Sequence, residues 1–262
     1  MTLLPVALLC LTLLTPAMAQ LLPPNPSGLT MGHVHLNVRS VEAQQKFWVE
    51  QFGATVVRSG VKLPGMLILF QQREPTGGTE GTVVDHLGLK VRSLAETLAR
   101  LRAGGFTILR EFTGSEGFPN AYAMGPDEVK LELQQDLTLA PTAASHHLHY
   151  YVSDPVAIRD WYVKTFSFQS GKRGAHLAAD APGMNLSFQP FKTPPTAGTK
   201  GRSLDHIGFE VKNLKTFCKQ LQASGVKLDT SYRKAPGLGI ASVFLTDPLG
   251  VSIELTEGLD RL

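Results

Sequence analysis

The stretch GHVHLNV at residues 32–38 decides the fold, because a close copy, HHLHYYV, stands at residues 146–152. Three further segments recur in the same order: PGMLILFQQ (64–72) as PGMNLSFQP (182–190), PTGGTEGTVVDHLGLKV (75–91) as PTAGTKGRSLDHIGFEV (195–211), and GPDEVKLEL (125–133) as DPLGVSIEL (247–255). The offset between the copies grows only from 114 to 122 residues. The second half of the chain is therefore a copy of the first with short loop insertions.

Each half divides again into two similar modules. The segments GHVHLNV and DHLGLKV (85–91) both alternate apolar with polar or small residues, which predicts a strand, and an amphipathic helical segment follows each of them. Ser40 precedes the first of these helices, and Ser93 with Glu96 forms a capping box for the second. Further alternating segments complete each quarter. The sequence thus predicts an α+β protein of four βαβββ modules.

The repeat also predicts the domain boundaries. We expect a first domain over residues 30–136, a linker, LTLAPTAA, over 137–144, and a second domain over 145–258. Residues 1–19 have the pattern of a signal peptide, because a short apolar run ends in the small-residue motif Ala-Met-Ala. The protein is then exported, periplasmic or secreted, with no stable membrane association after cleavage; an uncleaved N-terminal anchor is the alternative.

The charge composition of the chain excludes two classes of binding partner. The 25 basic and 22 acidic residues give a net charge of only +3, without a basic cluster, so neither nucleic acid nor a membrane surface is an expected partner. We expect a small-molecule substrate and a monomer or homodimer. Cleavage would leave Cys218 as the only cysteine, which excludes an intramolecular disulfide and favours a small buried apolar side chain.

Histidine and glutamate residues recur on the polar faces of equivalent strands. Alternation places His33 opposite the core-facing Val34 and Leu36. The same reasoning selects, over both halves, His33, His86, Glu132, His147, His206 and Glu254. Any one of these is ordinarily a surface residue, but the same three types appear in both copies. Two imidazoles and a carboxylate suit Fe2+, Mn2+, Zn2+ or Ni2+ and leave coordination positions open.

The DH(L/I)G(L/F)xV strands, the DPLGVSIEL terminus and the fourfold module plan resemble the vicinal oxygen chelate superfamily, which includes glyoxalase I, extradiol dioxygenases and bleomycin-resistance proteins. The resemblance implies that two modules curl into one cup with a metal ion inside. It implies one ligand set of His33, His86 and Glu132, and another of His147, His206 and Glu254. We therefore expect each half to bind one ion independently, with the chemistry at the C-terminal site.

A fourth protein ligand distinguishes members of this superfamily. The resemblance places Leu69 and Ser187 where glyoxalase I carries a carboxylate or amide ligand, and neither can replace it. A three-ligand site follows, as in extradiol dioxygenases. Gln71 and Gln189 lie two residues further on the same face, so a displaced ligand, a substrate contact or an exposed structural glutamine are all open.

Proton-transfer residues are the second distinguishing feature. Phe244 stands where extradiol enzymes have a tyrosine, whereas Tyr122 occupies the corresponding place in the first half. His35 and His149 repeat two residues beyond the expected ligands and could orient substrate or act as ligands themselves. We take Tyr122, His35 and His149 as candidate catalytic residues. His146 and His176 are expected to be structural or surface residues, with His176 as a possible replacement base.

Together these features predict a metal-dependent enzyme that acts on a small substrate with neighbouring oxygens. Dioxygenase-type chemistry with Fe2+ is favoured, since a 2-His-1-carboxylate set leaves room for substrate and dioxygen. A glyoxalase I-like lyase or isomerase is the alternative. A non-catalytic, resistance-type binding protein is a third possibility.

Overall fold

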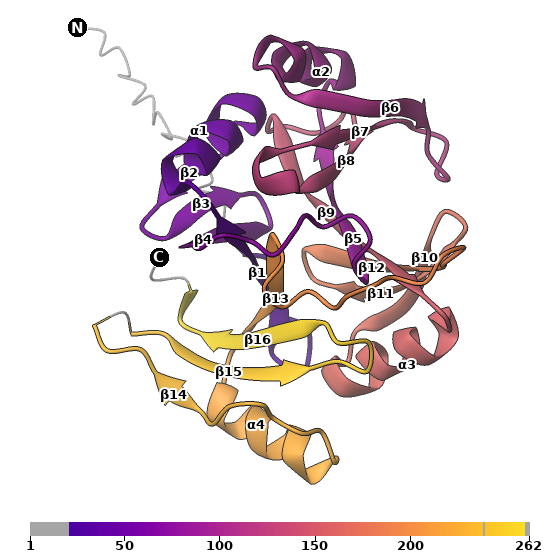
Figure 1. Ribbon diagram of the computed structural model, residues 1–262. Coiled ribbons are helices and arrows are strands. Elements are labelled where there is room, and N and C mark those ends of the chain that lie inside the picture. The colour runs from indigo at the N-terminus through magenta and orange to yellow at the C-terminus, as the bar shows by residue number, and fades with distance from the viewer. Residues whose placement is uncertain (1–20, 238, 260–262) are drawn as a thin grey trace, which may run out of the picture.

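The computed structural model describes residues 21–237 and 239–259, and four modules follow one another along this part of the chain (Figure 1). The first contains β1 (Leu29–Val38), α1 (Val41–Phe52), β2 (Thr55–Val57), β3 (Gly60–Leu63) and β4 (Met66–Gln72). The second contains β5 (Val84–Val91), α2 (Leu94–Ala103), β6 (Thr107–Thr113), β7 (Pro119–Met124), the 3-10 turn η1 (Pro126–Glu128) and β8 (Lys130–Gln135). The third contains β9 (Ala143–Val152), α3 (Pro155–Phe166), β10 (Gln169–Arg173), β11 (His176–Ala181) and β12 (Met184–Pro190). The fourth contains β13 (Leu204–Val211), α4 (Leu214–Ala223), β14 (Arg233–Lys234), β15 (Ala241–Thr246) and β16 (Ser252–Glu257). The predicted α+β class and the fourfold βαβββ plan are confirmed.

The modules combine into two eight-stranded sheets in an order that crosses the halves of the chain. One sheet has the order β14-β15-β16-β13-β1-β4-β3-β2 and joins the fourth module to the first. The other has the order β10-β11-β12-β9-β5-β8-β7-β6 and joins the third module to the second. We call these the first cup and the second cup. The expectation that residues 30–136 and 145–258 each form a cup is therefore wrong.

The contacts at the centre of each sheet explain this pairing. The strand β1 lies antiparallel to β13, with His35 opposite His206, and β5 lies antiparallel to β9, with His86 opposite His149. The expected linker is short, and β9 already begins at Ala143, opposite Val91 of β5. The chain leaves β8 on one side of β5, passes the end of β5, and forms β9 along the other edge of β5. Because β9 occupies that edge of β5, β1 pairs with β13 instead.

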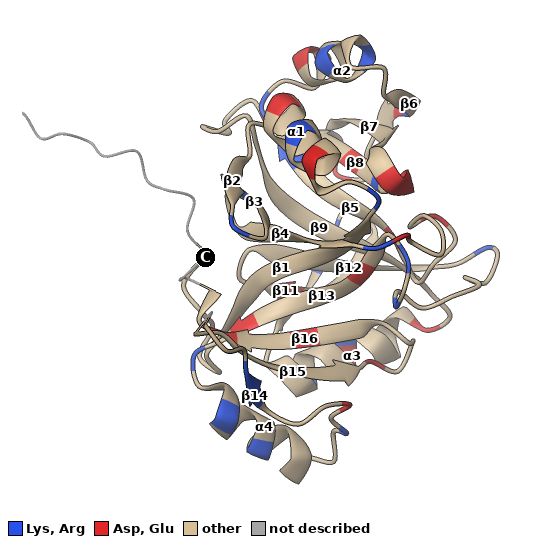
Figure 2. Cartoon of the chain, turned by 60° about the vertical axis from the view of Figure 1, so that its left-hand side comes forward, with Lys and Arg blue, Asp and Glu red and all other residues tan. Residues whose placement is uncertain are grey.

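Helix caps and apolar stripes act as the sequence predicts. The Ser40 hydroxyl accepts a hydrogen bond from the Ala43 amide, Ser93 accepts one from the Glu96 amide, and Gly53 ends α1 in the left-handed conformation. The apolar face of each strand packs under the helices, so that the core holds Val34, Leu36 and their equivalents. Figure 2 shows charged residues along α1, α2 and α4, on the outer side of the sheets. The opposite, concave face of each sheet is left for the site.

Two of the three connections between modules lie side by side and tie the cups together. Residues 73–83 and 191–203 form a bridge between Thr82 and Ala197, and Arg202 donates to the Gly78 carbonyl. Cys218 is a free, buried thiol, as expected. No helix within the described residues is long and apolar enough to cross a membrane. The expected signal peptide, residues 1–19, lies outside the described residues.

Candidate metal centres

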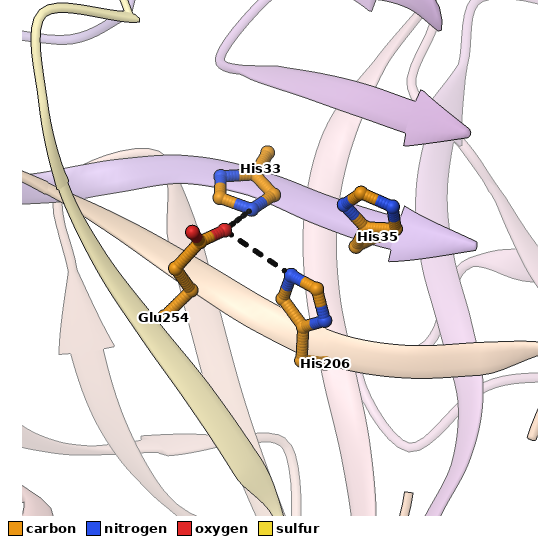
Figure 3. Close-up of side chains that lie close together, drawn as sticks. All are labelled: His33, His35, His206 and Glu254. Atoms are coloured by element: carbon orange, nitrogen blue, oxygen red, sulfur yellow. Dashed lines mark hydrogen bonds and ion pairs between the residues drawn. The ribbon is translucent and has the colours of Figure 1, made fainter. Parts of the chain in front are cut away.

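Four side chains of the first cup meet on its concave face: His33 and His35 from β1, His206 from β13, and Glu254 from β16 (Figure 3). We call them the first cluster. The Nε2 atoms of His33 and His206 lie 3.1 and 3.2 Å from the same oxygen, Oε2 of Glu254. Figure 3 shows both rings turned toward this carboxylate, with His35 beside them. Two imidazole nitrogens that converge on one carboxylate oxygen are the arrangement that a single cation would require.

Asp205 fixes the orientation of His206. Its Oδ1 accepts a hydrogen bond from the Nδ1–H of His206 at 2.7 Å, and its Oδ2 accepts from the Asn37 amide and the Gly201 backbone. The bond orients Nε2 of His206 toward the cluster. A carboxylate behind a histidine is the usual support of a metal ligand, and the DH dipeptide that supplies it stands in both halves of the sequence.

Glycines two residues beyond each DH histidine make room for the partner imidazole. A Cβ atom on Gly208 would lie 2.0 Å from Cε1 of His33, and one on Gly88 would lie 2.0 Å from the ring of His147. Both distances are far below van der Waals contact, so any other residue would displace the imidazole. The glycine in the DHxG motif is thus a requirement of the site, and its position in the repeat was visible in the sequence.

The second cup brings together His86, Glu132, His147 and His149, which we call the second cluster. The Nε2 atoms of His86 and His147 lie 2.8 and 3.5 Å from Oε2 of Glu132. Asp85 accepts the Nδ1–H of His86 at 2.7 Å, in the same way as Asp205 does for His206. All four residues are buried.

A buried arginine distinguishes the second cluster. Arg173 donates from Nε to the Ser187 hydroxyl at 2.8 Å and from Nη2 to Nδ1 of His149 at 3.3 Å, and its Nη1 lies 3.7 Å from Oε1 of Glu132. The other ring nitrogen of His149 lies 3.0 Å from Oε1 of Gln189. Both nitrogens of His149 are therefore occupied, whereas Nδ1 of the equivalent His35 is buried without a partner.

The six residues expected as ligands all lie in the two clusters, but the structure groups them differently from the expectation. His33 shares its cluster with His206 and Glu254, and His147 shares its cluster with His86 and Glu132. The cause is the crossed pairing of the sheets, which places β1 beside β13 and β9 beside β5. Neither half of the chain holds a complete set, so the expectation of two independent halves is wrong.

The ligand atoms of each cluster all lie within 4.8 Å of one another. Metal–nitrogen and metal–oxygen bonds of about 2.1 Å place two ligands of one ion at most about 4.2 Å apart, so closure by less than about 1 Å would be needed. Leu69 and Ser187 occupy the expected fourth-ligand positions opposite His35 and His149, as the register predicts. His35 offers the only additional imidazole among the described residues of the first cluster.

The other candidate residues lie around these clusters. Tyr122 contacts the ring of His86 edge-on at 5.1 Å, and Phe244 contacts His206 in the same way at 5.1 Å. His176 lies 5.1 Å from His149, between ring centroids. His146, expected to be a structural or surface residue, is half-buried, and its Nδ1 lies 3.1 Å from Nδ1 of His147.

Burial and carboxylate neighbours set the protonation states of the first cluster. Burial lowers the pKa of His33 below its ordinary value, and burial together with the nearby His206 lowers the pKa of His35 to about 3. Burial opposes ionisation of Glu254, but hydrogen bonds from His206 and His33 outweigh it and lower the pKa of this carboxyl. At neutral pH the first cluster thus offers a carboxylate and neutral imidazoles at His33 and His35. The pKa of His206 is raised instead, because its hydrogen bonds to Asp205 and Glu254 outweigh its burial, so a bound cation would replace a proton there.

A cavity of about 470 Å³ opens beside the first cluster. Its wall includes His33, His35 and Glu254, the turn residue Ser59, the apolar Leu69, Phe70 and Ile240, and the polar Gln71, Arg233 and Ser242. Because Arg233 pairs with Ser242 in register, and Ser242 in turn with Thr256, Arg233 shares the concave face with the cluster. The volume is sufficient for a small organic molecule.

Comparisons with known proteins agree with this fold. The model of the Glyoxalase/Bleomycin resistance protein/Dioxygenase superfamily matches residues 144–255. A search of curated protein sequences finds no significant match. Glyoxalase I from Zea mays has a similar structure with a TM-score of 0.66 and 14% identity, over 89% of this chain and 93% of that chain. A point mutant of the same enzyme gives a TM-score of 0.67 and 15% identity, over 89% of this chain and 93% of that chain. A putative dioxygenase from Bacillus subtilis subsp. subtilis str. 168 gives 0.65 and 14%, over 87% of this chain and 85% of that chain. The family model thus matches the second half of the chain, and the structural likeness, which extends over 87–89% of the chain, shows that the fold is shared with these proteins.

Proposed function

We propose that the chain is a metal-dependent enzyme whose active site is the first cup. The observation that carries the proposal is the convergence of His33 and His206 on one oxygen of Glu254, beside an open cavity. His33, His206 and Glu254 would hold the ion. The second cluster has the same ligand types, but among the cavities described none is lined by its residues.

The donor set defines the class of chemistry. A divalent ion held there, with Fe2+ favoured over Mn2+, Zn2+ or Ni2+, would supply Lewis acidity toward two neighbouring oxygens of a substrate and leave a position for dioxygen. Leu69 at the fourth-ligand position supports this, because its apolar side chain blocks one side of the site without adding a ligand. Dioxygenase-type chemistry is therefore the reaction that we favour.

Residues of the cavity would position the substrate. His35 is stacked on His206 at 4.5 Å and has an unpaired Nδ1, so it is placed to accept a proton from a substrate hydroxyl. Arg233 supplies a cation on the same face, which favours a substrate with an acidic group. Leu69, Phe70 and Ile240 would cover an apolar part of the molecule.

A glyoxalase I-like lyase or isomerase is the second candidate. It is favoured by His35, because proton transfer between neighbouring carbons needs a neutral base close to the metal-held oxygens. The absence of a carboxylate at Leu69 argues against it.

Oxygen uptake distinguishes the candidates. The Fe2+-loaded protein, prepared without oxygen, is assayed with a panel of catechols and 2-oxo acids, and in parallel with a hemithioacetal. We expect substrate-dependent oxygen consumption that His206→Ala abolishes. Hemithioacetal turnover without oxygen uptake would establish the lyase instead. Tight substrate binding without turnover of any kind would establish a non-catalytic binding protein.

A further inference from the structure

The hairpin that carries Arg173 is an insertion relative to its copy. In the first module two residues join β2 to β3, between Val57 and Gly60. In the third module, the segment between α3 and β12, which contains the hairpin β10–β11, is four residues longer than the segment between α1 and β4 of the first module. The inserted residues extend both strands and end in the pair Arg173 and His176.

The longer hairpin closes the second cup. Its tip packs against the loop between β6 and β7, so tightly that a Cβ atom on Gly174 would lie 2.2 Å from Oγ of Ser115. Arg173 also contacts Glu116 of that loop at 3.2 Å. In the first cup the corresponding turn is short, and the cavity opens between Ser59 of this turn and Ala235 of the opposite loop. The inserted residues of the hairpin thus cover the second cluster, whereas the space beside the first cluster is open.

The insertion also brings a positive charge to the ligands. The Arg173 side chain is only 5% exposed, and its guanidinium lies 3.7 Å from Oε1 of Glu132. A second buried cation, Lys130, lies 2.9 Å from Asp85, the support of His86. The position equivalent to Lys130 in the first cup is Ser252. In the second cup, arginine and lysine therefore already neutralise the carboxylates that a metal ion would neutralise.

The first cup is different in each respect. The bonds described there to Asp205 and Glu254 come from histidines, the Asn37 amide and the Gly201 backbone. Nδ1 of His33 and Nδ1 of His35 are buried without a partner, whereas the same atoms of His147 and His149 contact His146 and Arg173; in the second cup the unpartnered ring nitrogen is Nε2 of His147. A buried carboxylate without a basic partner favours a bound cation, whereas a carboxylate that already has one repels it.

We propose that the Arg173 guanidinium neutralises the Glu132 carboxylate of the second cluster in place of a metal ion. The chain then binds one divalent ion tightly, in the first cup. The ligand-type residues of the second cup then link β5, β8 and β9 to one another without a metal ion. Removal of the Arg173 charge should convert the second cluster into a second tight site. This inference rests on the proposed metal site of the first cup.

Titration with Co2+ under nitrogen tests the proposal. Calorimetry and the visible absorption of the bound ion measure the binding. The wild-type protein should bind one ion tightly and a second at least tenfold more weakly. Arg173→Met, which keeps much of the side-chain volume, should bind two ions, with the second at least tenfold tighter than in the wild type. Arg173→Lys should behave as the wild type, and Arg100→Met on α2 controls for the lost net charge.

The outcomes separate the two levels of inference. Two ions of equal affinity in the wild type, or no gain in Arg173→Met, would overturn the role of Arg173 and leave the proposed function standing. No Co2+ binding at all would overturn both. If Arg173→Met does not fold, His86→Ala gives the answer in the wild-type background: the single tight ion should remain, and its loss would contradict the proposal.

Discussion

The two cups of this protein hold the same ligand types on equivalent strands, yet their surroundings differ. Beside the first cluster lies an open cavity with Arg233 on its wall, and His35 has a free ring nitrogen. Beside the second cluster lies the buried Arg173, which donates a hydrogen bond to Nδ1 of His149 and lies close to the Glu132 carboxylate. A strand framework thus fixes which side chains meet, whereas the hairpins decide whether a metal and a substrate can reach them.

The largest expected difference between the cups is in turnover. His206→Ala removes a ligand from the first cluster and should reduce turnover by roughly 100-fold or more, since even loss of a residue behind a ligand costs 10–100-fold. His86→Ala makes the matched change in the second cluster and should alter turnover by less than about threefold, because we place no chemistry there. Steady-state rates at saturating metal measure both. Equal losses in the two variants would remove the functional asymmetry.

A smaller effect is expected from the supports of the histidines. Asp205→Asn keeps the shape of the side chain but weakens the hydrogen bond to His206, so Co2+ affinity should fall roughly 10–100-fold. The matched Asp85→Asn should leave the affinity of the tight ion unchanged, while it disturbs the ion pair with Lys130. Competition with a chromophoric chelator gives both constants. An effect confined to Asp85→Asn would place the tight ion in the second cup.

The paired glycines should separate metal binding from stability. Gly208→Ala and Gly88→Ala both place a Cβ 2.0 Å from an imidazole, so each should lower the free energy of unfolding by about 1–3 kcal/mol. Only Gly208→Ala should also weaken the tight ion, because it displaces His33. Urea unfolding of the metal-free protein and Co2+ titration provide the two readouts. Loss of the ion in Gly88→Ala alone would reverse the assignment.

The smallest effect concerns substrate recognition. Arg233→Gln removes one of the two cations that line the first cavity, the other being Lys234, and should raise KM roughly tenfold for an acidic substrate, with little change in kcat, since a charged hydrogen bond contributes about 1.5–3 kcal/mol. Lys172→Gln is the control, because Lys172 is an exposed residue of β10 in the other sheet and does not line this cavity. An unchanged KM in Arg233→Gln would remove the acidic group from the proposed substrate.

Much of the fold and the residues of the two clusters could be predicted from the sequence. The alternation of GHVHLNV placed His33 opposite Val34 and Leu36, and these two residues are indeed in the core. The repeat selected six of the eight residues that the structure collects into the two clusters as ligands, and the other two, His35 and His149, as candidate catalytic residues. Both are local properties, set by strand period and by copying, and they need no knowledge of how the modules pack.

The grouping of the ligands could not be predicted in this way. The edge of β1 can pair with β5 or with β13 equally well as far as local pattern goes, and only the assembled chain places β13 there. Arg173 could not be predicted for a related reason: it lies in an insertion that has no copy in the first half, so comparison of the two halves does not select it. Its signal in the sequence was the growth of the offset between the two halves.

The most direct test of the shared cups is whether the tight ion uses a histidine from the N-terminal or the C-terminal copy of β1. Co2+ affinity is measured for His33→Ala and for His147→Ala, with His206→Ala as the reference. If each cup combines both halves of the chain, His33→Ala loses the same ion as His206→Ala, and His147→Ala keeps it. Loss of that ion in His147→Ala, with retention in His33→Ala, would mean that each half of the chain forms its own site.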